Sequence, residues 1–437
     1  MFALQKYRNK NVAIYGMGIT GRSAARTFKR LKAKVFCWDD NKKIRKKIKK
    51  LNFPLNKFWL NKKVIDSIVI SPGIDINRCK IKKYLKKNIK KIKTDLDIFF
   101  ELNKESLIVS VTGTNGKSTT CKIIERILKT ARYKVKTVGN IGNPILSSTK
   151  VSKKNVLILE VSSYQLQYSK LFRSKHAAIL NISPDHLERH KDIKKYTSVK
   201  SKIFFAQIDS DYSYINSKNK YSKLIKNIFK NRKLKSKLIS VNSNESNFLL
   251  KKIKNKYLKD KSNLENFAFA YKIVKNLNVS DKVIIKALNK FKGLPHRQEI
   301  IISNKQITCI NDSKATSFDA CLQSLLNNNK IYWIVGGLPK YKDYFNLQKV
   351  KKKIIKAYII GKNINFFVKK IKQDVPYTIS NNLPRAIEQI RNDIKTNNNI
   401  RKTILLSPAA ASYDQFQNFE ERGSYFKKLI KKNFKEN

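Results

Sequence analysis

Short apolar runs alternate with longer amphipathic stretches along most of the chain. Near its start, NVAIYG (11–16), AKVFCWD (33–39) and SIVISPGI (67–74) are typical of buried strands, whereas GRSAARTFKRL (21–31) has the spacing of a helix. Strands that alternate with helices predict a parallel sheet with crossover helices. We therefore expect a Rossmann-like α/β domain over residues 1–93.

The same alternation continues in two further segments. A central domain over 94–297 is predicted from the strand SLIVSVTG, the helix KSTTCKIIERILKT and the strand NVLILEVSS, and its sheet should be mostly parallel. A third domain over 298–437 should be another Rossmann-like sheet, with KIYWIVGG, KAYIIG and KTILLSPAAAS as strands. One further strand is expected from Ile300 to Asn311. The chain is therefore predicted to be an α/β protein of three domains.

The charge balance is extreme, because 95 Lys and Arg residues against 30 Asp and Glu residues give a net charge of +65. Such a charge favours a nucleic-acid-binding protein. The lysines are nevertheless spread over the whole chain, and Lys, Asn, Ile, Phe and Tyr, which AT-rich codons encode, are all abundant. No zinc finger, basic zipper or ribonucleoprotein motif accompanies them. We attribute the charge mainly to compositional drift and expect no nucleic-acid partner.

Nothing in the sequence predicts export or a membrane partner. The stretch MFALQKYRNKN lacks the long apolar core of a signal peptide. No apolar run approaches the ~20 residues that span a bilayer. The five cysteines are scattered without a CxxC pair, which indicates reduced thiols. A cytoplasmic protein is expected.

The first strand runs into Gly16-x-Gly18-x-x-Gly21, the spacing of a dinucleotide-binding turn. Asp39 follows about twenty residues further on, where an NAD-binding domain carries its ribose-binding carboxylate. A dehydrogenase is therefore one interpretation. No hydride-transfer constellation follows in the rest of the chain, so the fingerprint predicts a diphosphate-binding turn without naming its ligand.

A second glycine-rich turn, VTGTNGKSTT (111–120), lies between a predicted strand and a predicted helix. Backbone N–H groups at a helix N-terminus bind phosphate, Lys117 can reach the β- and γ-phosphates, and the Ser118 hydroxyl can bind Mg²⁺. The general P-loop would require glycine at position 111, where valine stands, so the motif is a tighter G-x-x-G-K-S that begins at Gly113. The turn predicts an ATP site. A P-loop motor acting on nucleic acid is the alternative, but no convincing Walker B run is present.

Further polar residues become candidates from their positions alone. Glu160 ends the strand VLILE, where a carboxylate suits a hard cation. His186 and His190 have the spacing of the zinc signature H-E-x-x-H, but Leu187 stands where the glutamate belongs, so a zinc protease is rejected. Asn263 and Asn266 lie one helical turn apart and can face one cleft.

The compact loop GTNGKST resembles that of the Mur ligases and the related folylpolyglutamate synthases. The order of further blocks resembles the D-glutamate-adding branch, over essentially the whole chain. No D-[DN]-P-R motif of the diaminopimelate- or lysine-adding branch is present, and Asn115 stands where the L-alanine-adding branch usually has histidine. The blocks are GNIGNP (139–144), EVSSYQL (160–166), NISPDHLERH (181–190), GLPHR (293–297), NDSKATS (311–317) and LLSPAAASYDQFQNFEERG (405–423).

The resemblance implies ATP-dependent amide formation between UDP-N-acetylmuramoyl-L-alanine and D-glutamate in peptidoglycan precursor synthesis. An acyl phosphate and a tetrahedral intermediate would form, and ADP and phosphate would be released. The implied partners are these small molecules, and a monomer is expected. Another Mur ligase, or a ligase like folylpolyglutamate synthase, is the alternative. The implied ATP contacts are Gly113, Thr114, Asn115, Gly116, Lys117, Ser118, Thr119, Asn266, Arg297 and Asp312.

The resemblance also implies roles that the residue pattern alone would not reveal. Two Mg²⁺ ions would be held by Ser118, Glu160, His186 and Lys200, with Lys200 carbamylated so that its cation becomes an anionic ligand. Lys117, His186 and Lys200 are the implied catalytic residues. The implied contacts of the UDP substrate are Ile19, Thr20, Asp39, Ser71, Gly73, Asn140 and Ser162, and those of D-glutamate are Thr316, Lys340, Ser412 and Phe419.

Overall fold

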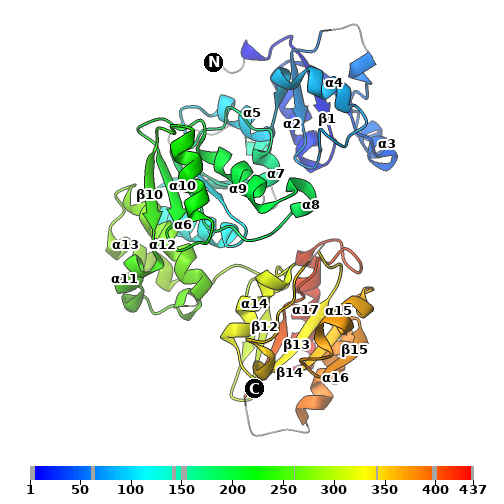
Figure 1. The fold of residues 1–437 in the computed structure, drawn as a ribbon, viewed down its shortest axis with the longest axis vertical. Coiled ribbons are helices and arrows are strands. Elements are labelled where there is room, and N and C mark those ends of the chain that lie inside the picture. Colours follow the sequence, from blue (N-terminus) through cyan, green and yellow to red (C-terminus); the bar gives the residue numbers. More distant parts are fainter. Residues whose placement is uncertain are drawn as a thin grey trace. The chain divides into compact units, whose positions relative to one another are not determined.

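The computed structural model describes residues 5–60, 64–139, 144–148, 155–259, 261–340, 343–395 and 401–434. The chain forms two compact units, Met1–Phe291 and Lys292–Asn437 (Figure 1). The described residues form two sheets in the first unit and one in the second. This arrangement confirms the predicted α/β class with three sheets.

The N-terminal sheet is parallel, with the strand order β2-β1-β3-β4. One face packs against α2, where Phe28 is fully buried, and the other packs against Phe58 and Leu85. The strands are β1 (Asn11–Tyr15), β2 (Lys34–Trp38), β3 (Ser67–Ile70) and β4 (Ile92–Lys93), and the helices are α2 (Ile19–Arg30), α3 (Lys42–Lys50) and α4 (Lys82–Lys87).

The central sheet is parallel in every described pairing, with the order β10-β9-β8-β5-β7-β6. Its β5 lies between β7 and β8, so loops after these three strands meet at one edge of the sheet. The strands are β5 (Leu107–Thr112), β6 (Lys134–Gly139), β7 (Asn155–Glu160), β8 (His176–Ile179), β9 (Tyr212–Asn216) and β10 (Lys237–Val241).

Helices cover both faces of the central sheet. Alternate residues of β5 belong to different apolar clusters, because Val109 packs with α6, α12 and α13, and Ile108 packs with residues of α9 and α10. The helices are α5 (Asp95–Leu102), α6 (Lys117–Thr130), α7 (Ser163–Leu166), α8 (Leu187–His190), α9 (Ile193–Ser201), α10 (Ser222–Asn231), α11 (Asn247–Lys252), α12 (Lys261–Lys275) and α13 (Asp281–Asn289).

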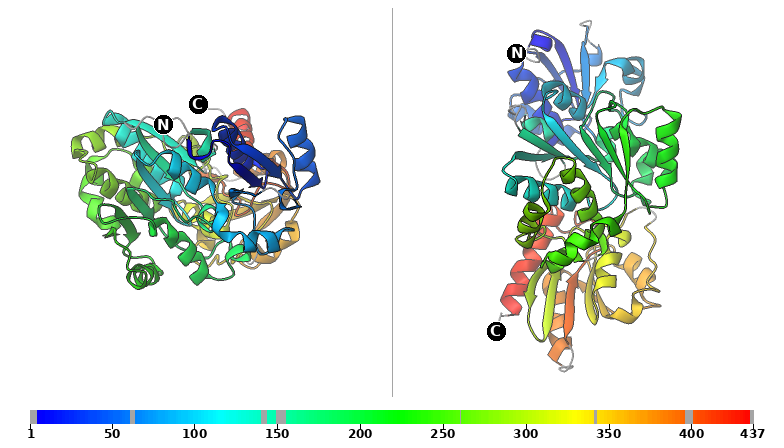
Figure 2. Two further views of the ribbon diagram at one scale, coloured as in Figure 1. Left: turned by 90° about the horizontal axis from the view of Figure 1, so that it is seen from above. Right: turned by 90° about the vertical axis from the view of Figure 1, so that its left-hand side faces the viewer.

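The sheet of the second unit has the order β11-β12-β16-β13-β14-β15. Figure 2 shows helices on both of its sides, with α17 in red on one and α15 on the other. The strands are β11 (Glu299–Ser303), β12 (Ile307–Asn311), β13 (Ile331–Gly336), β14 (Ile354–Ile360), β15 (Tyr377–Asn381) and β16 (Lys402–Leu406). The helices are α14 (Phe318–Asn327), α15 (Ile364–Ile371), α16 (Leu383–Lys395) and α17 (Phe419–Asn433).

The prediction of one strand from Ile300 to Asn311 is wrong, because this segment is split between β11 and β12, which pair antiparallel. The Asn304 side-chain oxygen accepts hydrogen bonds from the backbone N–H groups of Gln306 and Ile307, at 3.0 and 2.8 Å. These contacts stabilise a tight turn and reverse the chain.

In the part of the chain that the structure describes, no helix has the length and apolar character needed to cross a bilayer.

Candidate active site

The turn between β5 and α6 has the geometry that its glycines predict. Gly116 has a φ of +84°, and an added Cβ would lie 2.1 Å from Asn266 Oδ1. Glycine is therefore required here both for the backbone conformation and for the close approach of α12. The Thr120 hydroxyl donates to Asn266 Oδ1 at 3.2 Å, and Asn266 Nδ2 donates to Asn263 Oδ1 at 3.2 Å. The two asparagines thus lie together directly behind the turn.

Ser118 and Glu160 meet at the carboxyl ends of β5 and β7. The Ser118 hydroxyl donates to Glu160 Oε2 at 2.5 Å, and both residues are buried. They meet because Glu160 pairs in register with Val111, just before the turn that leads into α6. This contact places a hydroxyl and a carboxylate beside the N-terminus of a helix.

Lys200 lies on α9 and is only 2% exposed. Its Nζ donates to the carbonyl oxygen of Gly113 at 2.9 Å and approaches Thr112 Oγ1 at 3.4 Å. Burial, followed by the nearby cation of Lys117, lowers the pKa of Lys200 well below its ordinary value. Lys200 is therefore a candidate for a neutral amine beside the turn.

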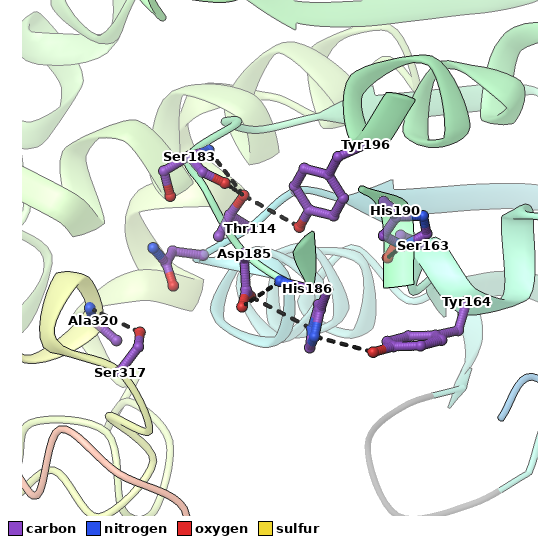
Figure 3. Close-up of polar contacts among 12 residues, drawn as sticks. Thr114, Ser163, Tyr164, Ser183, Asp185, His186, His190, Tyr196, Ser317 and Ala320 are labelled. Atoms are coloured by element: carbon purple, nitrogen blue, oxygen red, sulfur yellow. Dashed lines mark hydrogen bonds and ion pairs between the residues drawn. The ribbon is translucent and has the colours of Figure 1, made fainter. Parts of the chain in front are cut away.

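The loop after β8 brings His186 to the same edge of the sheet (Figure 3). His186 has a positive φ of 54° at the start of α8. Its Nε2 lies 3.4 Å from Asp185 Oδ2, and its Nδ1 lies 3.2 Å from the Tyr164 hydroxyl. His190 is turned elsewhere, toward the Ser163 hydroxyl at 3.0 Å, and burial lowers its pKa to about 4. His190 is thus a structural residue in this arrangement.

Several hydrogen bonds tie the loop after β8 to the glycine-rich turn. The backbone N–H of Ser183 donates to Thr114 Oγ1 at 3.0 Å (Figure 3), and the N–H of Asn115 donates to Asn181 Oδ1 at 2.9 Å. Within the described residues, no three His, Cys, Asp or Glu side chains form a cluster that could hold a metal ion. A hard cation here would therefore need ligands beyond such a cluster.

A cavity of about 360 Å³ lies in the first unit, between the turn after β1 and the start of α7. We call it the substrate cavity. Six of the seven predicted UDP-substrate residues line it, namely Ile19, Thr20, Asp39, Ser71, Gly73 and Ser162. The seventh, Asn140, lies outside the described residues.

Asp39 holds the shape of the N-terminal turn. Its Oδ2 accepts from the backbone N–H of Met17 at 2.6 Å, and its Oδ1 accepts from that of Asn41 at 2.8 Å. An added Cβ on Gly21 would lie 1.9 Å from the carbonyl oxygen of Gly16, so α2 packs closely against the turn. The fingerprint is thus built as the sequence predicts, as a strand, a tight turn and a helix N-terminus.

The second unit contains the remaining predicted residues. Thr316, Ser412 and Lys340 follow β12, β16 and β13, which are neighbours in the sheet, and Phe419 begins α17. Loops after adjacent parallel strands share one edge of a sheet, so these residues lie at a common edge. Ser412 is 3% exposed, and the Lys314 ammonium lies 3.7 Å from the centre of the Phe419 ring.

Two predicted ATP contacts also lie in the second unit. Arg297 is half-buried in the segment before β11, and Asp312 follows β12 and is buried. The Asp312 carboxylate accepts from the hydroxyls of Ser324 and Ser407, at 2.5 and 3.0 Å. Burial raises its pKa to about 6. The roles of Arg297 and Asp312 toward ATP stay predictions.

Sequence reasoning missed several residues around the substrate cavity. Asp95 and Gln165 line it, and Gln165 Nε2 donates to Asp95 Oδ2 at 3.0 Å. Gln165 Oε1 accepts from both the N–H and the hydroxyl of Ser162, at 3.0 Å each. The pattern Ser162-x-x-Gln165 is a helix capping box and could have revealed the contact between Ser162 and Gln165. No local pattern pointed to Asp95.

Comparison with known families gives two matches that cover different parts of the chain. Residues 10–93 match the model of the Mur ligase MurD-like N-terminal domain, and residues 111–284 match that of the Mur ligase middle domain. These are the segments that contain the N-terminal fingerprint and the loop at 113–118.

Curated proteins resemble the chain over nearly its full length. The UDP-N-acetylmuramoylalanine–D-glutamate ligase of Rickettsia felis is 36% identical, with 99% of each chain covered. The protein of the same name from Elusimicrobium minutum is 35% identical over 99% of this chain and 100% of its own.

Solved structures share the fold at low sequence identity. UDP-N-acetylmuramate-alanine ligase MurC from Thermotoga maritima aligns with a TM-score of 0.56 at 16% identity, covering 97% of this chain and 99% of that one. MurF ligase from the same organism, in complex with ADP, aligns with a TM-score of 0.57 at 13% identity, covering 98% and 97%. These likenesses concern the fold alone.

Proposed function

The chain belongs to the UDP-N-acetylmuramoylalanine–D-glutamate ligases of the Mur ligase family, and we propose that it joins D-glutamate to UDP-N-acetylmuramoyl-L-alanine using ATP. This membership confirms the resemblance found in the sequence blocks. One observation of the structure carries the proposal: the Ser118–Glu160 contact and buried Lys200 lie at the same glycine-rich turn. A turn of this composition suits phosphoryl transfer to a carboxylate.

The reaction proceeds in two steps. The substrate carboxylate oxygen attacks the γ-phosphorus of ATP, which forms an acyl phosphate and releases ADP. The D-glutamate amine then attacks the acyl carbon, and the tetrahedral intermediate expels phosphate as the amide forms and the amine loses its proton. Because ATP supplies the leaving group, the ligase mainly positions the reactants and stabilises charge.

We assign the phosphates of ATP to the turn at 113–119. The backbone N–H groups at the start of α6 favour anions. Lys117 lies at this helix start, and its Nζ donates to the carbonyl oxygens of Gly113 and Thr114, at 2.9 and 2.8 Å. A lysine in this place is within reach of the β- and γ-phosphates. Asn266, directly behind the turn, is assigned to the adenine side.

The residues at the turn fit Mg²⁺, which we propose as the metal, with two ions in all. Mg²⁺ prefers hard oxygen ligands and keeps several waters and phosphate oxygens, so it needs few protein ligands. The Ser118 hydroxyl and the Glu160 carboxylate, 2.5 Å apart, are such ligands, and His186 and Lys200 complete the proposed set. When bound, Mg²⁺ would neutralise charge on the phosphates.

The proposed role of Lys200 depends on its neutral form. An uncharged amine adds to carbon dioxide, forms a carbamate and releases a proton, and the carbamate is an anionic oxygen ligand. The lowered pKa of buried Lys200 supports this chemistry, because it increases the fraction of neutral amine at a given pH.

The substrate cavity suits the UDP end of the muramoyl substrate. Its lining combines the N-terminal fingerprint turn, which offers backbone N–H groups to a diphosphate, with Ser71 and Ser162.

D-glutamate is assigned to the second unit, where the Lys340 cation and the Ser412 hydroxyl are suited to its carboxylates. We expect a cytoplasmic monomer, whose state size-exclusion chromatography with light scattering would measure.

The proposal is tested with purified protein, ATP, Mg²⁺ and UDP-N-acetylmuramoyl-L-alanine. D-Glutamate, L-glutamate, L-alanine and meso-diaminopimelate are supplied in separate reactions, and ADP release and product mass are measured. Among the four amino acids, only D-glutamate is expected to give product. Product only with another amino acid would assign the chain to a different ligase activity.

A further inference from the structure

Arg189 lies on α8, three residues after His186, and its guanidinium reaches two other segments of the first unit. Its Nε donates to Gln167 Oε1 at 2.7 Å, and its Nη1 donates to the carbonyl oxygen of Gly73 at 3.3 Å. Its Nη2 donates to the carbonyl oxygen of Ile74. The planar fork of arginine holds such acceptors in a fixed geometry. Arg189 therefore joins two consecutive peptide groups of the loop after β3 to the loop that follows β8.

Residues 71–74, which we call the substrate turn, belong to the lining of the substrate cavity. The Ser71 hydroxyl donates to the carbonyl oxygen of Gly16 at 2.5 Å, so the substrate turn is joined to the fingerprint turn. Just beyond it, the backbone N–H of Ile76 donates to the Tyr168 hydroxyl at 3.1 Å. The substrate turn is thus held on one side by the fingerprint turn and on the other by residues near α7 and α8.

Arg189 is also connected to His186, through the side chain of Tyr164. The guanidinium lies 5.4 Å from the centre of the Tyr164 ring, a separation that suits a cation–π contact. The hydroxyl of the same tyrosine lies 3.2 Å from His186 Nδ1, and the two side chains point toward one another in Figure 3. Tyr164 therefore contacts both Arg189 and the proposed metal-binding histidine.

We propose that Arg189 is a positioning residue that joins the substrate turn to His186, so that filling the substrate cavity places His186 for phosphoryl transfer. This rests on the proposed function, which assigns the UDP end of the substrate to the cavity. A shift of the substrate turn acts on Arg189 through two hydrogen bonds, and Arg189 acts on His186 through Tyr164 and through α8. Binding at the cavity and binding at the ATP turn must then strengthen each other equally.

The test measures the affinity for a non-hydrolysable ATP analogue with Mg²⁺ by calorimetry, with and without UDP-N-acetylmuramoyl-L-alanine. In the unaltered protein we expect the muramoyl substrate to tighten analogue binding on the order of 10-fold. In Arg189→Met this factor should fall to near one, while the affinity for the analogue alone stays unchanged. Arg189→Lys, which keeps a cation but loses the fork, should give an intermediate factor, and it carries the test if Arg189→Met does not fold.

A second readout follows His186 itself and does not depend on turnover. In protein labelled with ¹⁵N-histidine, the muramoyl substrate should shift the imidazole signal of His186 in the unaltered protein and leave it in place in Arg189→Met. The matched control is Arg78→Met, because the Arg78 side chain is 72% exposed and pairs with Asp75 at 3.8 Å. This control should keep both the coupling and the shift.

The outcomes separate this inference from the proposed function. An unaltered protein that fails to bind the muramoyl substrate contradicts the proposed function. An unaltered protein that binds both ligands without coupling, or an Arg189→Met variant that keeps the full coupling and the His186 shift, overturns the role of Arg189 and leaves the proposed function standing.

Discussion

Lys117 and Lys200 donate to the same carbonyl oxygen, that of Gly113, each at 2.9 Å. Two ammonium groups at one acceptor repel each other, and this repulsion favours the neutral form of the buried one, Lys200. Burial is the larger cause of the lowered pKa of Lys200, and the charge of Lys117 adds to it. The pair thus has one lysine suited to phosphate and one suited to a neutral amine.

Replacing Lys117 should change both members of this pair. Lys117→Met is expected to abolish ADP release, because the γ-phosphate loses its cation, and to raise the pKa of Lys200 toward its ordinary value. A ¹³C-NMR signal of carbamate from labelled carbon dioxide should weaken accordingly. Lys122→Met is the control, since Lys122 pairs with Glu125 on the same helix. If Lys117→Met kept its turnover, the proposal that the glycine-rich turn binds the phosphates of ATP would be wrong.

Lys200→Ala should lose activity and regain part of it when short carboxylic acids are added, because these restore an anionic oxygen ligand beside Gly113. Steady-state ADP release with and without acetate measures the rescue. Lys202→Ala is a close control, since its Nζ donates to the carbonyl oxygen of Gln167 rather than to the turn. An active Lys200→Ala enzyme would show that the carbamate role is wrong.

Ser412→Ala should raise the KM for D-glutamate more than the KM for ATP. The reason is that Ser412 follows β16 at the edge of the second sheet, beside the loops that carry Thr316 and Lys340. Initial rates at varied concentrations of each substrate give the two constants. Ser424→Ala, an exposed position on α17, should leave both unchanged. A larger effect on ATP would place the amino acid elsewhere.

Asp95 should make the protein less stable as the pH rises. Burial raises the pKa of Asp95 from 3.8 to about 6, so the folded protein holds this proton more tightly than the unfolded chain does. Its contribution to the free energy of unfolding therefore decreases as the pH rises from about 4 to about 6, and it stays at the lower level above pH 6. The total decrease is at most about 3 kcal/mol.

Thermal unfolding at pH 5 and pH 8 tests this expectation in Asp95→Asn. The variant should lose less stability between the two pH values than the unaltered protein does, because a neutral amide has no charge to bury. Asp209→Asn, at an exposed position, should follow the unaltered protein. An equal loss in Asp95→Asn would mean that Asp95 is not the group that titrates.

Local sequence predicted a large part of this molecule. The turns at Gly16 and Gly113 lie where the sequence predicts them, because each combines an apolar strand, glycines and a helix start within a dozen residues. The same local reasoning failed between Ile300 and Asn311, where a side-chain contact at Asn304 reverses the chain. The predicted domain boundaries, after residues 93 and 297, stay predictions.

By itself, the sequence determined the class of fold and the two glycine-rich turns, because strand, helix and turn preferences act between neighbours in the chain. It also determined the family, through blocks spread over the whole length. The tertiary structure decided which distant groups meet: Lys200 with Gly113, Glu160 with Ser118, and Arg189 with Gly73. Strand order and packing bring these groups together and bury them, and burial sets the pKa on which the proposed role of Lys200 depends.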